Sequence, residues 1–546
     1  MEKTRKLTKI DYIIMFTLTF LYAFLAFYHL GSLENPNTFA SDTSIIIDLA
    51  KEQEISKIRY FTGHEMGKVT LSYATDNQEY TVFKNLQDIP VFTWNDLEIN
   101  QSFRYLKIEI DDKSHLGEIA FYKKNGERIS VKESEENKLL LDEQSVVPKE
   151  ISFENSTYFD EIYFARTAYE YAYQLPAYEW VHPPLGKVFI SIPIRLFKMA
   201  PFYYRLMPTL AGILMIPVLY ILAKRMFQKT KYAFLASLLL AADGFHFAHT
   251  RMASVDAFLV LFLLLSFLFM YEYLVSKKEI PLSKRLTKLF LSGLFIGCAI
   301  ATKWTAFFGA LALAIFFFLH FFQNYREKKA FKKEGYKILL WCVLFFVLIP
   351  LTIYISLYLC FPNMYYFQTG SLSKITNITQ QMYAYHASLK ADHPFYSSWY
   401  TWPLMLKPVW YYAGSVGNLK STISGFGNPI VWWLGTLSMF YMLYKSIKKD
   451  KKAIFITGTY ICLLISYVGI TRGMFLYHYF PALPFTILAA TYLIKDMTEK
   501  IHKNYLYIGV IIMVVFFFYY FFPVVSGMPV NKDRIDATKW LTTWIY

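Results

Sequence analysis

Residues 255–275 of the chain read VDAFLVLFLLLSFLFMYEYLV, and a basic segment that includes Lys277 and Lys278 follows them. Asp256 and Glu272 are the only charged side chains within the run. About 20 residues of apolar helix cross the ~30 Å hydrocarbon core of a bilayer. We therefore predict that this segment is a membrane-spanning helix.

The same pattern of apolar runs separated by basic segments recurs along the 546-residue chain. Hydrophobic residues make up 55% of the chain and charged residues 18%, whereas globular proteins carry about 25% charge. We expect an α-helical polytopic membrane protein with about eleven transmembrane helices. The runs lie at about residues 12–30, 204–224, 232–248, 255–275, 288–303, 305–322, 338–360, 427–444, 453–470, 474–494 and 505–523.

Lys and Arg clusters occupy every second loop between the predicted spans. Loops that stay in the cytoplasm keep an excess of these residues, so the N-terminus is predicted to be cytoplasmic and the C-terminus extracytoplasmic. The net charge of +15 is spread over these clusters, and no nucleic-acid partner is therefore expected. The expected parts are a first anchor (1–36), an extracytoplasmic β-sandwich with its linker (37–150), a catalytic juxtamembrane region (151–203), a transmembrane bundle (204–360), a second outer loop (361–426) and a C-terminal bundle with an outer tail (427–546).

The segment from Asn37 to Ser130 has the composition of a soluble β domain. Apolar and polar residues alternate in stretches such as Tyr105–Ile110, and turn signals such as Lys124-Asn125-Gly126 separate these stretches, which is typical of a β-sandwich. The order of the stretches resembles discoidin-type, galactose-binding-like jelly rolls. Binding of a sugar or acceptor and service as a spacer or protein contact are both open as the role of this domain.

An acidic pair, Asp160 and Glu161, follows the β domain among aromatic residues. Adjacent carboxylates raise each other's proton affinity, and aromatic neighbours lower the local dielectric, so one of the pair is a candidate general base. The alternative interpretation is a solvated cap at a helix start, where negative charge favours the helix dipole.

Residues 176–187 read PAYEWVHPPLGK, and the adjacent Pro183 and Pro184 form a rigid turn that holds His182 and Lys187. Together with Asp160 and Glu161, this string resembles the protein O-mannosyltransferase family of membrane glycosyltransferases. Further matching segments occur in family order at residues 205–206, 251–258, 301–304, 393–403, 427–429 and 477–481.

The resemblance implies a type C glycosyltransferase fold. Such an enzyme takes a sugar from a polyprenyl-phosphate carrier and attaches it with inversion to an acceptor hydroxyl on the outer face. Mannose is the expected sugar here, and another sugar is the alternative. Protein Ser/Thr is the favoured acceptor, and a cell-envelope polymer or a lipid is the alternative. The resemblance makes Asp160 the general base and Glu161 its partner.

The second outer loop is too short for the β-trefoil module of the eukaryotic members, so the resemblance implies a bacterial-type member in the cell membrane. The chain has no glycine-rich phosphate loop beside a βαβ pattern. A donor anchored in the lipid, the expected partner here, does not require one.

A lipid-linked donor requires cations at headgroup depth for its phosphate. The candidates, each expected near the outer ends of the spans or on the proline turn, are Arg205, Lys303, His478, His182 and Lys187. The alternative for Arg205 is a snorkelling interfacial arginine. His182 and His478 are equally compatible with hydrogen-bonded histidines of the core.

Aromatic residues of the second outer loop are candidates for stacking on the sugar or acceptor, with an interfacial aromatic belt as the alternative. The candidates are His393, Trp399, Trp402 and Tyr477. Arg251 and Asp256 are interpreted as a structural ion pair. Asp243, His246 and His249 have a metal-like spacing, but no further acidic or cysteine ligand accompanies them, so no metal residue is assigned and a divalent ion stays an open possibility.

Two other classes of function compete with glycosyl transfer. A transporter or flippase of lipid-linked sugars also has many spans with intramembrane charges, but transporters often contain repeated halves, and the sequence shows no such repeat. A non-catalytic sensor that presents the β domain outside is the third possibility.

Overall fold

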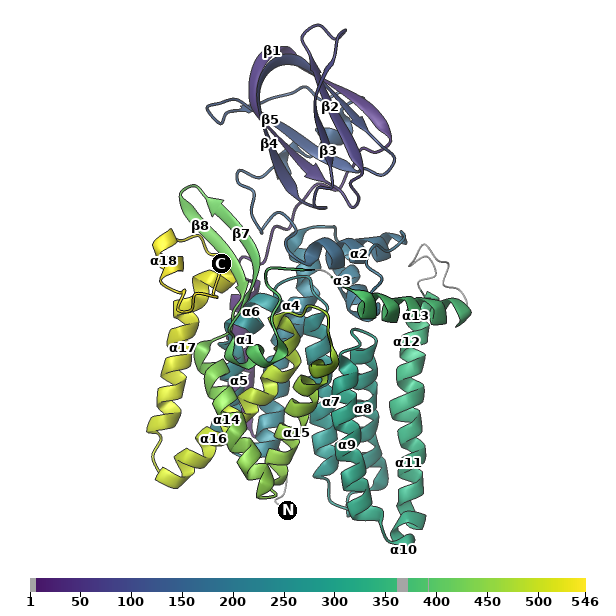
Figure 1. Ribbon diagram of the computed structural model, residues 1–546, viewed down its shortest axis with the longest axis vertical. Helices are drawn as coiled ribbons and strands as arrows, with labels where there is room; N and C mark the ends of the chain where they lie inside the picture. The colour runs from purple at the N-terminus through teal and green to yellow at the C-terminus, as the bar shows by residue number, and fades with distance from the viewer. Residues whose placement is uncertain (1–5, 361–371, 391) are drawn as a thin grey trace. The chain divides into compact units, whose positions relative to one another are not determined.

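The computed structural model describes residues 6–360, 372–390 and 392–546 (Figure 1). The chain divides into two compact units. The β unit consists of His29–Tyr178 and Ile190–Leu206, and the helical unit consists of Met1–Tyr28, Glu179–Phe189 and Met207–Tyr546.

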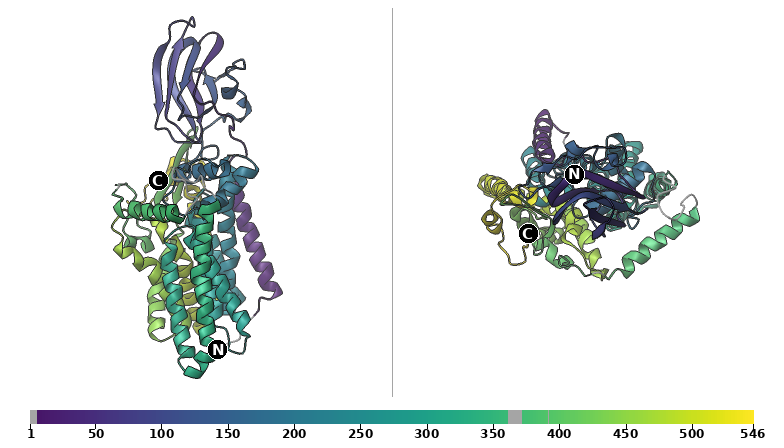
Figure 2. Two further views of the ribbon diagram at one scale, coloured as in Figure 1. Left: turned by 90° about the vertical axis from the view of Figure 1, so that its right-hand side faces the viewer. Right: turned by 90° about the horizontal axis from the view of Figure 1, so that it is seen from above.

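One six-stranded antiparallel sheet forms the main body of the β unit, with strand order β3-β2-β4-β1-β5-β6. Two long strands, β1 and β4, dominate the sheet (Figure 2). Register shifts in β1 between Asp48 and Gln53 and between Ile55 and Lys57 interrupt the ladder that joins them. Such bulges bend a strand and increase its twist. The strands are β1 (Thr43–Thr62), β2 (Lys68–Ala74), β3 (Thr81–Gln87), β4 (Trp94–Ile110), β5 (Leu116–Tyr122) and β6 (Arg128–Ile129).

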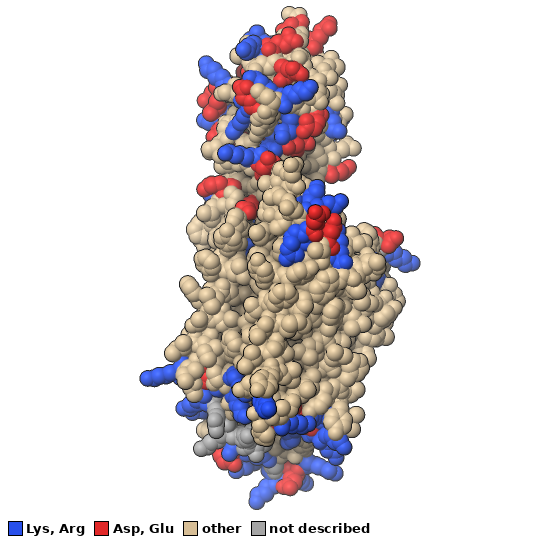
Figure 3. Space-filling model, turned by 90° about the vertical axis from the view of Figure 1, so that its left-hand side faces the viewer, with Lys and Arg blue, Asp and Glu red and all other residues tan. Residues whose placement is uncertain are grey.

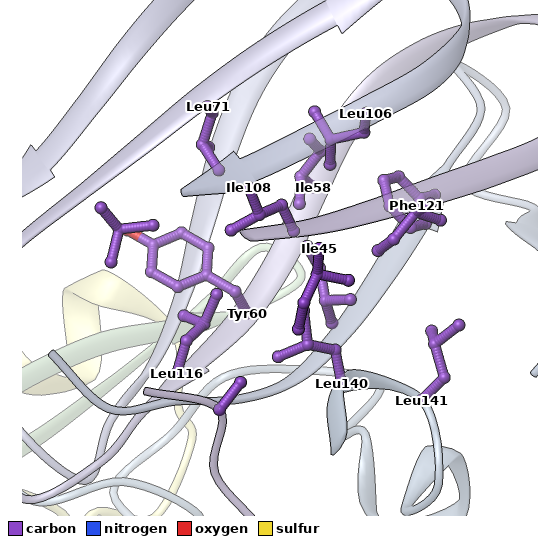
Figure 4. Close-up of a cluster of buried hydrophobic side chains, with 14 of the residues drawn as sticks. Ile45, Ile58, Tyr60, Leu71, Leu106, Ile108, Leu116, Phe121, Leu140 and Leu141 are labelled. Carbon is purple, nitrogen blue, oxygen red and sulfur yellow. The ribbon is translucent and has the colours of Figure 1, made fainter. Parts of the chain in front are cut away.

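The alternating apolar residues of these strands point into one core, as the period-2 pattern predicts (Figure 4). Ile58, Leu106 and Phe121 are fully buried there. The charged segment at residues 131–150 is the part of the chain that the sequence predicts as a linker. Its Leu140 and Leu141 are 0% and 4% exposed in the same core. That segment is therefore part of the domain, because its two leucines cover the sheet.

Helices complete the β unit after the sheet. Helix α2 (Glu161–Tyr173) begins directly after Asp160. Helices α3 (Leu185–Leu196) and α4 (Pro201–Phe227) each contribute residues to both units.

Helices occupy all eleven stretches that the sequence predicts as membrane spans. Within the described residues, seven helical segments are long and apolar enough to cross a membrane. They are Lys9–Phe27 (α1), Pro201–Phe227 (α4), Asp256–Leu274 (α7), Ala306–Tyr325 (α9), Phe331–Cys360, Lys451–Gly469 and Tyr505–Ser526 (α17). The fifth of these segments includes α11 (Tyr336–Val343) and α12 (Ile349–Cys360), and the sixth includes α15 (Lys451–Ile465). The other predicted spans are taken up by α5 (Thr230–Ala241) with α6 (Gly244–Thr250), α8 (Leu282–Ile300), α14 (Pro429–Ile447) and α16 (Leu483–Ile501).

The predicted span at 232–248 is broken at Asp243, whose carboxylate accepts the N–H of His246 and caps α6. Between α12 (Ile349–Cys360) and α14 lie helix α13 (Leu372–Ser388) and the hairpin of β7 (Val409–Val416) and β8 (Leu419–Gly425).

Most of the face of the helical unit that Figure 3 shows carries no charged side chain, and Lys and Arg side chains gather at its lower edge. Large apolar side chains on its surface are exposed, such as Phe16 on α1 at 62% and Phe516 on α17 at 52%. Such a surface is stable in lipid and not in water. The prediction of a polytopic α-helical membrane protein with a β-sheet domain is confirmed.

Candidate active site

Asp160 lies in the β unit at the point where irregular chain turns into α2. The backbone carbonyl of Asp160 accepts the N–H groups of Tyr163 and Phe164, both at 3.0 Å. The residue before it, Phe159, has a φ of 49°. Left-handed backbone is costly for a bulky residue and persists where neighbouring contacts enforce it. The carboxyl group of Asp160 is therefore presented by a tightly constrained turn.

Glu161 is fully buried and forms a bidentate ion pair with Arg205, which is 1% exposed. Nε of Arg205 donates to Oε1 and Nη2 to Oε2, both at 2.7 Å. Paired N–H groups on a carboxylate fix orientation as well as charge. The two carboxylates therefore differ in their surroundings. Glu161 is buried in an ion pair, and Asp160 lies at the start of α2.

The remaining N–H groups of Arg205 bind the backbone. Nη1 donates to the carbonyls of Leu30 at 2.9 Å and Phe153 at 2.8 Å, and Nη2 donates to the carbonyl of Ser156 at 3.1 Å. Every guanidinium N–H group is therefore engaged by the protein. This geometry suits Arg205 to hold the Asp160 turn, and the phosphate role predicted for it stays a prediction.

Lys187 has a similar structural role in the helical unit. Its ammonium group is fully buried and donates to the carboxylate of Glu179 and to the carbonyls of Glu179 and His182. The Glu179 carboxylate also binds Nδ1 of His182 at 2.8 Å. Burial raises the pKa of Glu179, but Lys187 and His182 outweigh it and bring that pKa to about 2. The three donors of Lys187 thus hold the proline turn, and the phosphate role predicted for this residue also stays a prediction.

Lys303 is held differently. Its ammonium group lies 2.8 Å from Oδ1 of Asp256 and 5.5 Å from the centre of the Tyr477 ring. Nε2 of His249 lies 3.5 Å from the other oxygen of Asp256. The carboxylate predicted to pair with Arg251 thus has Lys303 as its cation, whereas Arg251 donates to the carbonyls of Ala26 and Tyr28.

Aromatic rings from two separate parts of the chain, Trp402 and the adjacent Tyr477 and His478, stack beside this pair. The His478 ring lies 5.9 Å from Trp402 and 4.7 Å from Tyr477, with the planes 17° and 23° apart. Lys303, Trp402, Tyr477 and His478 therefore form one cluster, which we call the cation–aromatic cluster. The structure brings together four of the residues predicted as site residues.

A polar cavity of about 360 Å³ lies in the helical unit. Trp399, Tyr400 and Arg472 are among the residues that line it. His393 lies near it, with its ring 5.6 Å from that of Tyr396, another lining residue. Sequence reasoning missed Arg472, which is a single arginine in the short connection from α15 to α16; its place between two apolar runs is the one signal that pointed to it.

An apolar cavity of about 670 Å³ shares Tyr400 with the polar cavity. Trp433 and Phe440 of α14 line it together with Ile461 of α15. A polar and an apolar cavity joined at one residue suit a ligand with a charged head and an apolar chain.

The metal-like spacing of Asp243, His246 and His249 does not produce a joint site. The Asp243 carboxylate accepts from the backbone N–H of Asn428 and from Nε1 of Trp432. His246 binds the hydroxyl of Tyr22, and His249 binds that of Tyr411. Each side chain is used for packing within the bundle.

Family models match most of the chain after its β unit. The model described as dolichyl-phosphate-mannose-protein mannosyltransferase matches residues 198–361, and the model of the C-terminal four-transmembrane region of protein O-mannosyltransferase matches residues 371–544. The chain belongs to the protein O-mannosyltransferase family. The matched ranges contain the whole cation–aromatic cluster and exclude the β-sheet domain.

Relatives of this family member include the polyprenol-phosphate-mannose–protein mannosyltransferase of Mycolicibacterium smegmatis, which is 24% identical over 456 residues covering 71% of this chain and 87% of the relative. The protein of the same name from Mycobacterium tuberculosis is 23% identical over 430 residues, covering 67% of this chain and 81% of its own.

Among solved structures, the Saccharomyces cerevisiae Pmt1-Pmt2 complex bound to its sugar donor is similar in fold. The TM-score is 0.64 at 14% sequence identity, and the alignment covers 71% of this chain and 89% of that chain. The predicted family and type C fold are confirmed, and this family member is a multi-pass membrane protein.

Proposed function

We propose that the chain is an inverting membrane mannosyltransferase that moves mannose from a polyprenyl-phosphate carrier to a serine or threonine hydroxyl of a protein. The family match across residues 198–544 carries this proposal, because it encloses the cation–aromatic cluster and both cavities. The mycobacterial relatives, which are named for this reaction, align over most of their own length.

Asp160 acts as the general base. Its carboxylate takes the proton from the acceptor hydroxyl while the oxygen forms a bond to the anomeric carbon of the sugar. The bond from that carbon to the phosphate oxygen breaks in the same step, and the polyprenyl phosphate leaves with the electron pair. A single displacement of this kind inverts the anomeric configuration. Glu161, neutralised by Arg205, keeps the turn of Asp160 in place.

The donor phosphate binds cationic and polar groups of the helical unit. Lys303 is the first candidate, because a carboxylate and an aromatic face hold it without using all its donors. His478 and Arg472 are the next candidates, and His182 stays a weaker one because Glu179 already binds it. Positive charge near the phosphate stabilises the developing negative charge on the leaving oxygen.

The two cavities give a place for the rest of the substrates. The apolar cavity along α14 and α15 accepts part of the prenyl chain. Trp399 in the polar cavity, with His393 beside it, contacts the sugar or the acceptor peptide. Trp402 and Tyr477 stack on the ring of His478 and act on the substrates through that ring. No part of this scheme uses a metal ion.

The location proposed for the enzyme is the cell membrane of a bacterium. The alternation of basic and apolar segments supports a cytoplasmic N-terminus and an extracytoplasmic C-terminus. The β domain and Asp160 then lie outside the cytoplasm, on the side where secreted acceptors are available.

The test uses the full-length protein in lipid nanodiscs. Synthetic polyprenyl-phosphate mannose is supplied with a peptide rich in Ser and Thr, and NMR of the glycopeptide gives the anomeric configuration. We expect O-linked mannose of the configuration opposite to that of the donor, and no product from a peptide in which Ala replaces Ser and Thr. A product of retained configuration, or sugar that stays on its carrier as in a transporter, overturns the proposal.

A further inference from the structure

The β domain forms backbone contacts with the segment that leads to Asp160. The loop before β4 runs beside this segment: the N–H of Thr157 donates to the carbonyl of Phe92 at 3.1 Å. Oγ1 of Thr157 donates to the carbonyl of Val91 at 2.7 Å and lies 2.9 Å from Oγ1 of Thr93. Thr157 precedes Asp160 by one short turn of chain.

The same segment is held by Arg205 through the carbonyls of Phe153 and Ser156. Ser156 also accepts, with its side-chain oxygen, the N–H of Trp94 at 3.1 Å. The segment at residues 153–157 is therefore held by hydrogen bonds from two sources, the loop before β4 and the buried Arg205. Both the loop and Arg205 belong to the β unit.

Helix α2, which starts after Asp160, is held by the domain as well. The Tyr169 ring lies 5.1 Å from Phe92 and 5.5 Å from His64. The His64 ring lies 3.9 Å from that of His115, which comes from the loop before β5. Nη2 of Arg166 on the same helix lies 4.0 Å from a carboxylate oxygen of Glu65.

We propose that the β domain is a positioning element of the active site: it fixes Asp160 by holding Thr157 and α2, and this hold requires uncharged His64 and His115. The inference rests on the proposed function, since it gives Asp160 the role of base. It assigns to the domain a part in catalysis in place of a sugar-binding or spacer role. The domain acts through Asp160 and touches no substrate in doing so.

The two histidines explain why the hold depends on pH. Nδ1 of each is buried and has no hydrogen-bond partner within the described residues. Burial, with the neighbouring His115 and Arg166 acting in the same direction, lowers the pKa of His64 to about 3. Burial also lowers the pKa of His115, with Glu65 acting in the opposite direction and Arg166 in the same one.

The sign follows from proton counting. We call the state in which His64 and His115 are buried against α2 the docked state, and the state in which they are exposed to water the released state. A histidine in the released state has a pKa of about 6.5, so this state binds more protons below that pH than the docked state does. The docked state is therefore fully favoured above about pH 6.5. Its equilibrium constant falls by up to about tenfold per pH unit for each histidine as the pH drops towards the pKa of the docked form.

The first experiment compares Thr157→Val with Thr157→Ser in the full-length enzyme. Valine keeps the shape of threonine and removes the bonds to Val91 and Thr93, whereas serine keeps the hydroxyl. We expect Thr157→Val to lower kcat by about tenfold or more with an unchanged donor KM, because small misplacement of a reacting group is costly. Thr157→Ser restores kcat. Thr70→Val, which removes a hydroxyl bonded to Asn85 elsewhere in the domain, is the matched control and retains the wild-type rate.

The second experiment replaces both histidines by phenylalanine, which keeps the ring contacts and removes the titration. We expect the ratio of kcat at pH 7.5 to kcat at pH 5.5 to be several-fold smaller in His64→Phe/His115→Phe than in the wild type. An unchanged ratio overturns the dependence on the histidines.

Asp160→Asn separates this inference from the proposed function. If Asp160→Asn retains transfer, Asp160 is not the base and the proposed function fails. If Asp160→Asn is inactive while Thr157→Val has the kcat of the wild type, the base stands and the positioning role of the β domain is overturned.

Discussion

Arg205 in the β unit and Lys303 in the helical unit both pair with a buried carboxylate, but they differ in what remains for a ligand. Arg205 gives two N–H groups to Glu161 and its others to three backbone carbonyls. Within the described residues, Asp256 is the single hydrogen-bond partner of the Lys303 ammonium group, and an aromatic ring lies near it. The number of committed donors, rather than burial, therefore separates a structural cation from a candidate ligand-binding one.

The largest expected effect comes from breaking the committed pair. Arg205→Met leaves Glu161 charged and buried without a cation, which costs about 3–5 kcal/mol of folding free energy. It also removes the bonds that hold Phe153 and Ser156. We expect most of the protein to be lost from the membrane, as measured by quantitative blotting against wild type. Wild-type levels of folded Arg205→Met contradict a structural role.

A buried carboxyl with no cation extends the comparison. Glu118 in the β domain has no basic group within ion-pair distance among the described residues, and it accepts hydrogen bonds from Gln144 and the backbone of Glu143. Burial raises its pKa to about 7 against these bonds, which lower it, while Asp142 and Glu143 add to the rise.

The folded state thus binds a proton that the unfolded chain releases near its usual pKa of about 4.3. The contribution of Glu118 to stability is complete below that value and is lost as the pH rises through about 7. We expect the β domain to be less stable at pH 8 than at pH 5 by up to about 3 kcal/mol. Thermal unfolding of wild type and Glu118→Gln at both pH values measures this, and an equal pH dependence in the two proteins contradicts it.

Removing both charges of the Lys303–Asp256 pair tests whether Lys303, unlike Arg205, binds a ligand. In Asp256→Asn/Lys303→Met no unpaired charge is left, so the folding cost is expected to be small. The donor KM is expected to rise by about 100-fold, since a charge-assisted bond to the phosphate is lost. Donor titrations at fixed acceptor concentration measure the change. An unchanged KM removes Lys303 from the phosphate site.

Arg472 gives the smallest of these effects. It lines the polar cavity and is only partly buried, so Arg472→Gln is expected to raise the donor KM by about tenfold, the loss of one partly solvated charge contact. Its thermal stability is expected to match that of wild type. Lys407→Gln, which removes a basic residue of the second outer loop that does not line the polar cavity, is the control, and equal effects of the two variants rule out a specific role for Arg472.

The sequence predicts the spans well because a run such as residues 255–275 has one stable structure in a bilayer. It also predicts the domain strands, through alternation. It does not predict that Leu140 and Leu141 close the core, since a charged segment with two leucines is also compatible with a linker.

The site divides along the same line. Trp402, Tyr477 and His478 are found from the sequence because they occur in motifs that resemble a family. The hydrogen bonds of Arg205 cannot be found in this way. Its partner Glu161 lies 44 residues away in the sequence, and the backbone carbonyls that Arg205 binds carry no sequence signal. Pairing of this kind depends on the fold, so the sequence alone identifies the cation without its role.

The rate of mannosyl transfer by Asp160→Asn at saturating donor and acceptor tests the central claim most directly. Asparagine keeps the size of the side chain and removes its basicity, and general base catalysis contributes about 10²–10⁴-fold. We predict a loss of that size, with normal amounts of protein in the membrane and an unchanged donor KM. A rate within a few-fold of wild type contradicts the assignment of Asp160 as the base.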